Sequence, residues 1–204
     1  MKQQLLLIIF LGISISSAYS LDVNFTTNTF KGKEKNYVEF YMQVVGTSVH
    51  FKTVDSTKMQ SGVEVTLLFK QNDKIINFDK YTLNSPVFDQ FNLKTLNFID
   101  VKRYPLENGT YDLEIKVRDI NKEDNVFSTS HKLTIDYSKE KLELSDIQLV
   151  DYYTASNENN PSVKNGFYLE QHTSDMYEIF YKKINLYAEI YNSDKLFDNE
   201  FVIK

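Results

Sequence analysis

The sequence predicts an all-β protein, in which an Ig-like β-sandwich is followed by a second, incomplete β-sandwich domain. The first observation is that apolar and polar residues alternate in segments spaced like the strands of a sandwich. The second is the abundance of aromatic residues, with 14 Tyr and 15 Phe, because aromatic side chains favour the half-buried surface of a pleated sheet. No segment shows a competing helical period, so the fold class rests on the strand pattern.

Residues 1–20 have the three parts of a secretory signal peptide. Lys2 provides the positive charge, an apolar stretch runs from Leu5 through Ile15, and the small residues Ala18 and Ser20 precede a cleavage point. An apolar stretch of about a dozen residues is shorter than the roughly 20 that a helix needs to span a bilayer. We therefore expect cleavage of the signal and export to the periplasm or the cell exterior, with no membrane span left in the chain.

The composition excludes several kinds of function. The chain has no Cys, which rules out disulfides, thiolate nucleophiles, Cys-ligated metals and a lipoprotein anchor. Its formal net charge is -5 and its Lys and Arg residues are dispersed along the sequence, whereas nucleic-acid binding needs clustered cations that neutralise phosphates. The sequence is therefore more typical of a bacterial envelope protein, and we expect no nucleic-acid partner.

Residues 21–137 contain enough strands for one nearly complete sandwich. The clearest strand is 37–45, and Gly46-Thr47 is expected to turn the chain into a partner strand at 49–53. Further strands are expected at 63–70 and 75–83, joined by a hairpin turn at Gln71-Asn72-Asp73. Residues 87–104 are less regular and predict no clear strand.

The second half of this domain has the pattern of a tyrosine corner. Gly109 precedes Tyr111 and an alternating strand at 111–117, as in Ig-like sandwiches, where a Tyr hydroxyl ties the preceding loop to the sheet. Residues 119–125 are polar and predict a turn, after which residues 127–135 are expected to pair back.

Residues 138–141 are a short charged linker, and residues 142–204 form a second β domain. Strands are expected at 142–149, 167–169, 177–181, 184–191 and 201–203. Roughly 65 residues are few for an independent sandwich, so we expect this domain to be truncated.

Several segments resemble GWxTD domain-containing proteins, an envelope family of Bacteroidetes. The segments are Tyr37-Val-Glu-Phe-Tyr41 with Gly46 and Val49-His-Phe51, Leu106-x-x-Gly109-x-Tyr111 with Asp119, Leu144-Ser-Asp-Ile-Gln-Leu149, Asn165-Gly166, and Tyr187-Ala-Glu-Ile-Tyr-Asn192. The resemblance implies that the chain is the N-terminal β region of such a protein. The naming motif needs a Trp, and this chain has none, so the C-terminal GWxTD segment would be missing.

The sequence shows no recognisable catalytic site. It has no G-x-S-x-G elbow, P-loop or G-x-G-x-x-G motif, and its three His residues are far apart. Carboxylates at Glu39, Glu64, Asp112 and Glu114 alternate with apolar neighbours, which predicts solvated strand faces rather than a catalytic pair. We therefore expect a non-enzyme without a cofactor.

One loop offers a weak calcium candidate. Asp119, Asn121 and Glu123 supply oxygen atoms between two strands, but the EF-hand Gly and terminal Glu are absent. The alternative is a plain polar hairpin loop.

Tyrosines are the remaining candidates for binding. Tyr37 and Tyr41 lie on the face of their strand opposite the expected core, and Tyr187 and Tyr191 lie opposite Leu186 and its apolar neighbours. Such rings can anchor a protein or stack on a sugar, or they can be covered by the second β domain. We expect a non-catalytic envelope module that acts through protein–protein contacts or as a spacer; the alternative is a carbohydrate-binding module, so the partner is an envelope protein or a glycan.

Overall fold

The computed structural model describes residues 20–89, 97–173 and 183–196. All of the predicted signal peptide except Ser20, and the strands expected at 177–181 and 201–203, lie outside the described residues. In the part of the chain that the structure describes, no helix has the length and the hydrophobicity that crossing a bilayer requires.

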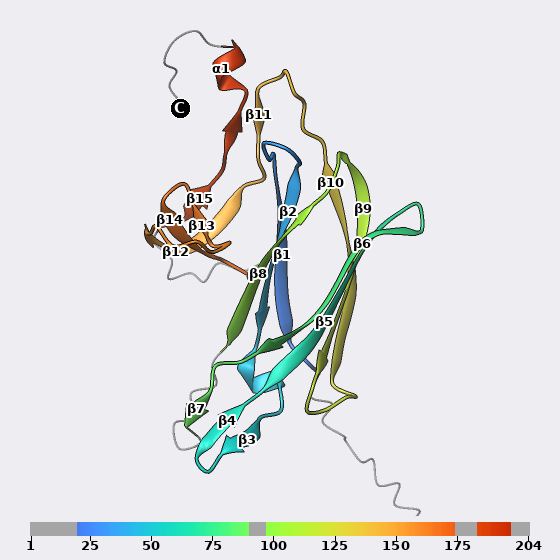
Figure 1. Ribbon diagram of the computed structural model, residues 1–204, viewed down its shortest axis with the longest axis vertical. Coiled ribbons are helices and arrows are strands. Elements are labelled where there is room, and N and C mark those ends of the chain that lie inside the picture. Colours follow the sequence, from blue (N-terminus) through green and yellow to red (C-terminus); the bar gives the residue numbers. More distant parts are fainter. Residues whose placement is uncertain (1–19, 90–96, 174–182, 197–204) are drawn as a thin grey trace, which may run out of the picture.

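Antiparallel strands make up nearly all the regular structure, which confirms the all-β fold class. The strands up to residue 137 are β1 (Val23–Phe30), β2 (Tyr37–Val44), β3 (Lys52–Asp55), β4 (Lys58–Gln60), β5 (Gly62–Gln71), β6 (Lys74–Asn84), β7 (Phe88–Asp89), β8 (Phe98–Pro105), β9 (Gly109–Asp119) and β10 (Val126–Ile135). Two sheets, β1-β2-β8 and β10-β9-β5-β6, face each other (Figure 1), and a small sheet, β3-β4-β7, lies at one end.

The core lies between the two large sheets. The alternating residues of β2, β5 and β9 fill it, among them Phe40, Met42, Leu67, Phe69 and Ile115. The predicted core face of residues 37–45 is therefore confirmed. Burying this apolar surface is the main driving force for the fold.

Two local predictions about the sandwich are confirmed. Asn72 and Asp73 have φ angles of 50° and 62°, as a two-residue hairpin turn between β5 and β6 requires. The Tyr111 hydroxyl donates a hydrogen bond of 3.0 Å to the carbonyl of Glu107, which is the bond of a tyrosine corner.

The pairing expected after residue 45 is wrong. The chain leaves β2 through a short 3-10 turn, Gly46–Ser48, and β3 pairs with β4 in the small sheet rather than with β2. The neighbours of β2 are instead β1 and β8, and β8 lies in the segment that predicted no clear strand.

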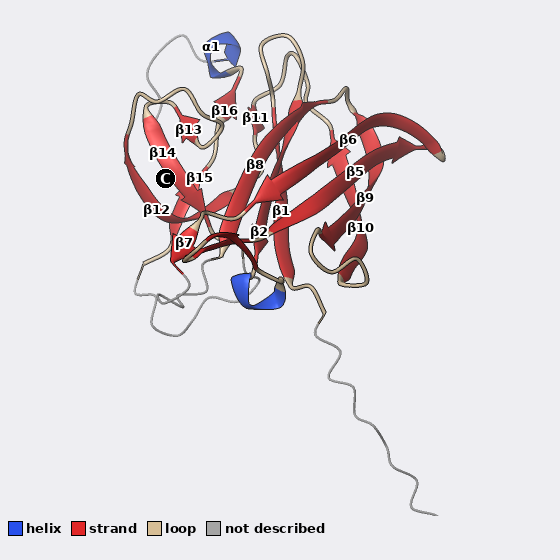
Figure 2. Cartoon of the chain, turned by 60° about the horizontal axis from the view of Figure 1, so that its bottom comes forward, coloured by secondary structure: helices blue, strands red, loops and turns tan. Residues whose placement is uncertain are grey.

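A second group of strands lies against the outer side of the β1-β2-β8 sheet (Figures 1 and 2). Its elements are β11 (Glu143–Leu144), β12 (Gln148–Ala155), β13 (Val163–Lys164), β14 (Phe167–Gln171), β15 (Asn185–Tyr187), β16 (Ile190–Tyr191) and the short helix α1 (Ser193–Leu196). The order in its sheet is β13-β14-β12-β15, and β11 pairs with β16. We call residues 143–196 the second unit and residues 20–137 the sandwich.

Candidate functional site

The outer face of β2 is buried beneath the second unit. Tyr41 is only 2% exposed, and its hydroxyl accepts a hydrogen bond of 3.3 Å from the backbone N–H of Gln171. The Tyr37 ring stacks on the Phe30 ring, with 5.4 Å between the ring centroids. The Tyr187 ring of the second unit packs against the same Phe30 ring, with 6.3 Å between the centroids. Tyr41 is therefore not a surface tyrosine: of the alternatives given for it, cover by the second β domain holds, and it is not available to an outside partner.

The other two candidate tyrosines share one carboxylate. The hydroxyls of Tyr187 and Tyr191 donate to the two oxygens of Glu189, at 2.6 and 2.8 Å. Tyr191 also accepts a hydrogen bond of 3.0 Å from the backbone N–H of Lys31. Burial, and then the bond to Glu189, raise the pKa of both tyrosines above the usual value. All four candidate tyrosines are thus engaged in contacts within the chain.

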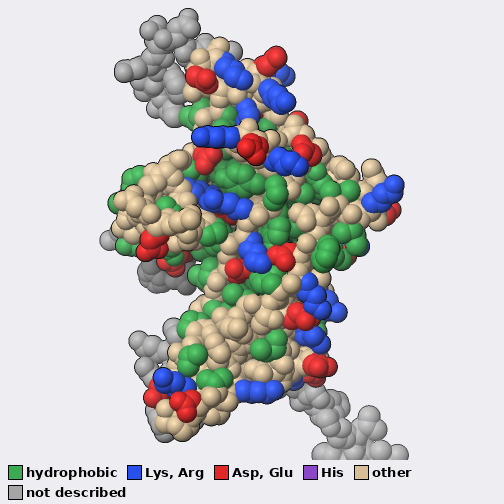
Figure 3. All heavy atoms as spheres, in the orientation of Figure 1, with side chains coloured by type: hydrophobic (Ala, Val, Ile, Leu, Met, Phe, Trp, Pro, Cys, Tyr) green, Lys and Arg blue, Asp and Glu red, His purple; other side chains and the backbone are tan. Residues whose placement is uncertain are grey.

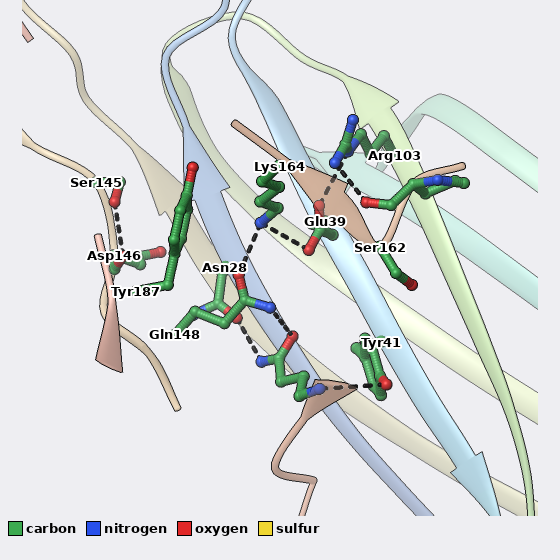
Figure 4. A network of polar contacts seen from close by, with 12 residues as sticks. Asn28, Glu39, Tyr41, Arg103, Ser145, Asp146, Gln148, Ser162, Lys164 and Tyr187 are labelled. Atoms are coloured by element: carbon green, nitrogen blue, oxygen red, sulfur yellow. Dashed lines mark hydrogen bonds and ion pairs between the residues drawn. The ribbon is translucent and has the colours of Figure 1, made fainter. Parts of the chain in front are cut away.

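Glu39 lies at the centre of this interface. It is 1% exposed, so the prediction of a solvated face is wrong for this residue. Its Oε1 lies 2.8 Å from the Nζ of Lys164, and its Oε2 lies 2.9 Å from the Nε of Arg103 (Figure 4). One carboxylate thus joins β2, its neighbour β8, and β13 of the second unit.

Lys164 is the charged side chain that the second unit inserts into the interface. It is 5% exposed, and its ammonium also donates to Oε1 of Gln148 at 2.7 Å. The same nitrogen lies 3.7 Å from the centre of the Phe30 ring and 5.1 Å from that of Tyr187, within the range of cation–π attraction. Burial lowers the pKa of Lys164, and the Glu39 carboxylate opposes that shift.

A chain of buried amides continues the network. Gln148 donates to Gln171 at 3.2 Å, and Gln171 donates to Oδ1 of Asn28 on β1 at 2.6 Å. Asn28 in turn donates to the carbonyl of Ile147 at 3.3 Å. Buried polar groups are costly unless they are hydrogen-bonded, so these bonds fit only one position of the second unit.

Backbone contacts complete the interface near Thr29. Its N–H and its hydroxyl both donate to Oδ2 of Asp146, at 2.7 and 2.8 Å. Its carbonyl accepts from the Tyr137 hydroxyl at 2.7 Å and from the backbone N–H of Asp146 at 3.3 Å. We refer to this set of contacts around Glu39, Lys164, the amides and Thr29 as the joint.

The joint can hold two β units in one arrangement, but its chemistry does not suit catalysis. Lys164 and Glu39 are enclosed, and their hydrogen bonds are directed at each other and at neighbouring side chains. Removing one partner of a buried ion pair leaves an uncompensated charge. The arrangement therefore favours a single docked position over alternatives.

In the loop that was the calcium candidate, the carboxylate oxygens of Asp119 accept hydrogen bonds from neighbouring groups. Asp119 is fully buried, and its Oδ2 accepts from the N–H of His50 at 2.7 Å and lies 3.0 Å from the His50 Nδ1. Its Oδ1 accepts from the N–H of Asn121 at 2.8 Å, and Asn125 donates to Oδ2 at 3.3 Å. Glu123 is exposed, and the described residues contain no cluster of three His, Asp or Glu side chains that could hold a metal. The geometry is that of a polar hairpin loop in which Asp119 organises the backbone.

Of the three remaining strand carboxylates, Asp112 is exposed, as expected of a solvated strand face, and the other two pair with cations. Glu64 lies 3.2 Å from Lys80 and 3.1 Å from Arg118, and Glu114 lies 2.6 Å from Lys70. These pairs lie on the partly exposed outer face of the β10-β9-β5-β6 sheet, where such ion pairs contribute little to stability.

An apolar groove of about 360 Å³ lies on the second unit. Its lining residues are Val150, Tyr153, Phe167, Leu169, Lys183, Ile184, Asn185, Leu186 and Tyr187. Tyr153 and Phe167 are 47% and 45% exposed, so two aromatic rings are open to solvent here.

Sequence reasoning missed the residues that build the joint from the second unit. Lys164 lies in a polar loop, and a Lys in such a segment gives no local sign of burial. Gln148 lies between Ile147 and Leu149 and resembles a solvated position, and Gln171 lies in the polar run Glu170-Gln171-His172, which gives no sign of burial either. The one available sign was on β2, where Tyr37 and Tyr41 flank Glu39 on one face.

No protein-family model matches the chain, and neither the curated proteins nor the solved structures contain a match.

Proposed function

We propose that the chain is a non-catalytic module of a bacterial envelope, which acts through protein–protein contacts and as a rigid spacer. The observation that carries this proposal is the joint. A spacer must keep a fixed distance between its two ends. A buried, hydrogen-bonded network between two β units supports this role because it holds the units in a fixed arrangement. The predicted signal peptide supports the location.

The resemblance to the GWxTD envelope family supports the same proposal. The residues that carry it include Glu39, Asp146 and Glu189, and each of these lies in or beside the joint. A family resemblance that rests on interface residues fits a structural role better than a chemical one.

Exposed apolar side chains offer places for partners. Figure 3 shows hydrophobic side chains on the surface of both units. Phe78 on β6 is 66% exposed, and Leu144 and Leu186 on the second unit are 62% and 61% exposed. Each of these side chains is a position at which a partner could bury apolar surface.

A photo-cross-linking amino acid placed at Phe78, Leu144 or Leu186 tests the protein-contact proposal. In envelope extract we expect a discrete adduct of one mass at one or more of these positions, and none from the exposed Lys132 on β10 as the matched control. The same adducts at all four positions, or no adduct, would contradict a specific contact.

Carbohydrate binding is the second candidate function, favoured by the exposed rings of Tyr153 and Phe167 at the apolar groove, which Tyr187 also lines. Aromatic rings open to solvent can stack on sugar faces. On a glycan array, Tyr153→Ala should then reduce retention and Tyr37→Ala should leave it unchanged. Absence of any retained glycan would exclude this candidate.

A further inference from the structure

A second cavity is lined by residues of the β1–β2 connection and by Lys195 of α1, two segments that lie at the same end of the molecule (Figure 1). Its volume is about 510 Å³. Its lining includes the lysines Lys31, Lys33, Lys35, Lys139 and Lys195. The sandwich contributes most of these residues, and the segment after Tyr137 contributes Lys139 and Lys195.

The cavity concentrates positive charge. Five of its 11 lining residues are Lys and two are Glu, whereas Lys and Arg together make up only 23 of the 204 residues of a chain with a formal net charge of -5. The lysines are dispersed in sequence, and the fold gathers them. Clefts lined by charge of one sign focus the electric field and attract ions of the opposite sign.

Two of these ammonium groups are fixed in place without being neutralised. The Nζ of Lys31 donates to the carbonyl of Ser138 at 3.0 Å and to Oδ1 of Asn192 at 2.6 Å. The Nζ of Lys195 donates to the carbonyl of Lys139 at 2.6 Å. Carbonyl and amide oxygens carry no net charge, so the positive charge stays available while the side chains are already ordered.

The other three lysines leave a positive excess at the opening. Lys35 forms an exposed ion pair of 3.4 Å with Glu107. Within the described residues, neither Lys33 nor Lys139 forms a side-chain ion pair. Glu34 is the only other carboxylate in the lining, so it is the residue that opposes an incoming anion.

We propose that this cavity binds a small multivalent oxyanion, of the kind carried by phosphorylated or polyphosphate compounds. Ordered ammonium groups and oxyanions form charge-assisted hydrogen bonds, which are stronger than neutral ones. Lys is suited to this task as a compact charge that several oxygens can approach. The site is separate from the protein contacts proposed above.

The anion would also connect the sandwich to the second unit. Lys31 belongs to the sandwich, whereas Lys195 belongs to the second unit. An anion held by both groups binds only the docked arrangement, so it should stabilise the folded chain by an amount that rises with the logarithm of its concentration above Kd.

Isothermal titration of the exported chain with tripolyphosphate at low salt tests the site. We expect binding of one anion per chain, weakened about tenfold in the double variant Lys33→Gln/Lys139→Gln and weakened by added salt. Glu34→Gln should tighten binding, because it removes the opposing charge. Lys116→Gln and Lys132→Gln, at exposed positions on β9 and β10, are the matched controls and should bind like the unmodified chain.

Sedimentation with vesicles that contain phosphatidic acid, whose headgroup is a phosphomonoester, distinguishes two sources of the oxyanion. Vesicle binding that is lost in Lys33→Gln/Lys139→Gln would assign the site to a lipid headgroup, and tripolyphosphate binding without vesicle binding would assign it to a free phosphate compound. Equal affinity of tripolyphosphate for all variants, or no binding at low salt, would overturn the proposal. All substituted residues are exposed, so the variants should keep the far-ultraviolet circular dichroism of the unmodified chain.

Discussion

The ammonium group of Lys164 lies 2.8 Å from the carboxylate of Glu39, and both side chains are almost fully shielded from water. Lys164 belongs to the second unit and Glu39 to the central strand of a sandwich sheet. The contact exists only when the two units are docked, so it reports on the arrangement of the whole chain.

Substituting Lys164 by Met should destabilise the chain. The change leaves the Glu39 carboxylate buried with Arg103 as its only cationic partner, and breaking a buried pair from one side costs about 3 kcal/mol or more. Urea unfolding measures this loss, with Lys132→Met on the exposed face of β10 as the control. A loss below about 0.5 kcal/mol, the range of ordinary surface changes, would contradict a buried pair.

The double variant Glu39→Met/Lys164→Met should be more stable than Lys164→Met alone. It removes both buried charges, and replacing a whole buried pair by apolar side chains is often neutral. The Arg103 side chain that remains is 35% exposed, so its guanidinium can be solvated. Equal instability of the two variants would show that Lys164 acts through packing rather than charge.

Tyr111→Phe should lower the free energy of unfolding by about 1 kcal/mol, because it removes the hydrogen bond to Glu107 and leaves that carbonyl without this donor. Tyr152→Phe on the second unit is the matched control, since Tyr152 is exposed. Chemical denaturation of both variants checks the difference. An effect equal to that of the control would mean that the corner bond does not contribute to stability.

Asp119→Asn should destabilise the chain by about 2 kcal/mol. Both carboxylate oxygens of Asp119 accept hydrogen bonds, and the substitution replaces one of these acceptors by an NH2 group, which cannot accept them. Added calcium should leave the melting temperature unchanged, since the Asp119 oxygens already accept hydrogen bonds from His50, Asn121 and Asn125. A melting temperature that rises with calcium and no longer rises in Asp119→Asn would restore the calcium hypothesis.

High pH should unfold the chain. Burial raises the pKa of Tyr37 to about 12, and burial likewise raises the pKa of Tyr41, Tyr104, Tyr187 and Tyr191. An unfolded Tyr loses its proton near pH 10, so above about pH 10 the unfolded state binds fewer protons than the folded state and stability falls as pH rises.

Lys164 has the opposite effect on stability. Burial lowers its pKa in the folded state, so just below its ordinary pKa the unfolded state binds more protons and stability rises with pH. This is the contribution of one group, whereas several tyrosines lower stability at high pH. Urea midpoints at about pH 9 and about pH 11, with tyrosinate absorbance as a second readout, measure the effect. Equal midpoints would contradict the burial of these hydroxyls.

The sequence predicted the strands well where one face of the strand is exposed to solvent and the other lies in the core. β5 and β9 have this pattern, and the turn at Asn72-Asp73 and the Tyr111 corner are set by residues near one another in the chain. Such features depend on local geometry, so residue type alone predicts them.

Cover of β2 by the second β domain was one of the expected alternatives, but the residues that make the joint could not be predicted because they depend on contacts between distant segments. β2 alternates like a half-exposed strand, yet both its faces are covered. The sequence did not predict β8 for a similar reason. Lys102 and Arg103 interrupt its apolar alternation, and they are accommodated there because they pair with Asp79 and Glu39. Amphipathic patterns indicate which face is polar, but they do not distinguish a polar face in water from a polar face against another unit.

Hydrogen exchange followed by mass spectrometry on the intact chain tests the central claim that the second unit is docked on β1 and β2. The N–H group of Gln171 on β14 donates across the joint to Tyr41, and β12 pairs with β14, so peptides from β12 and β14 should exchange about as slowly as those from β2. The Lys164→Met variant should accelerate exchange in β12 and β14 first. Rapid exchange of β12 and β14 in the unmodified chain, with β2 still protected, would show that the two units are not held together.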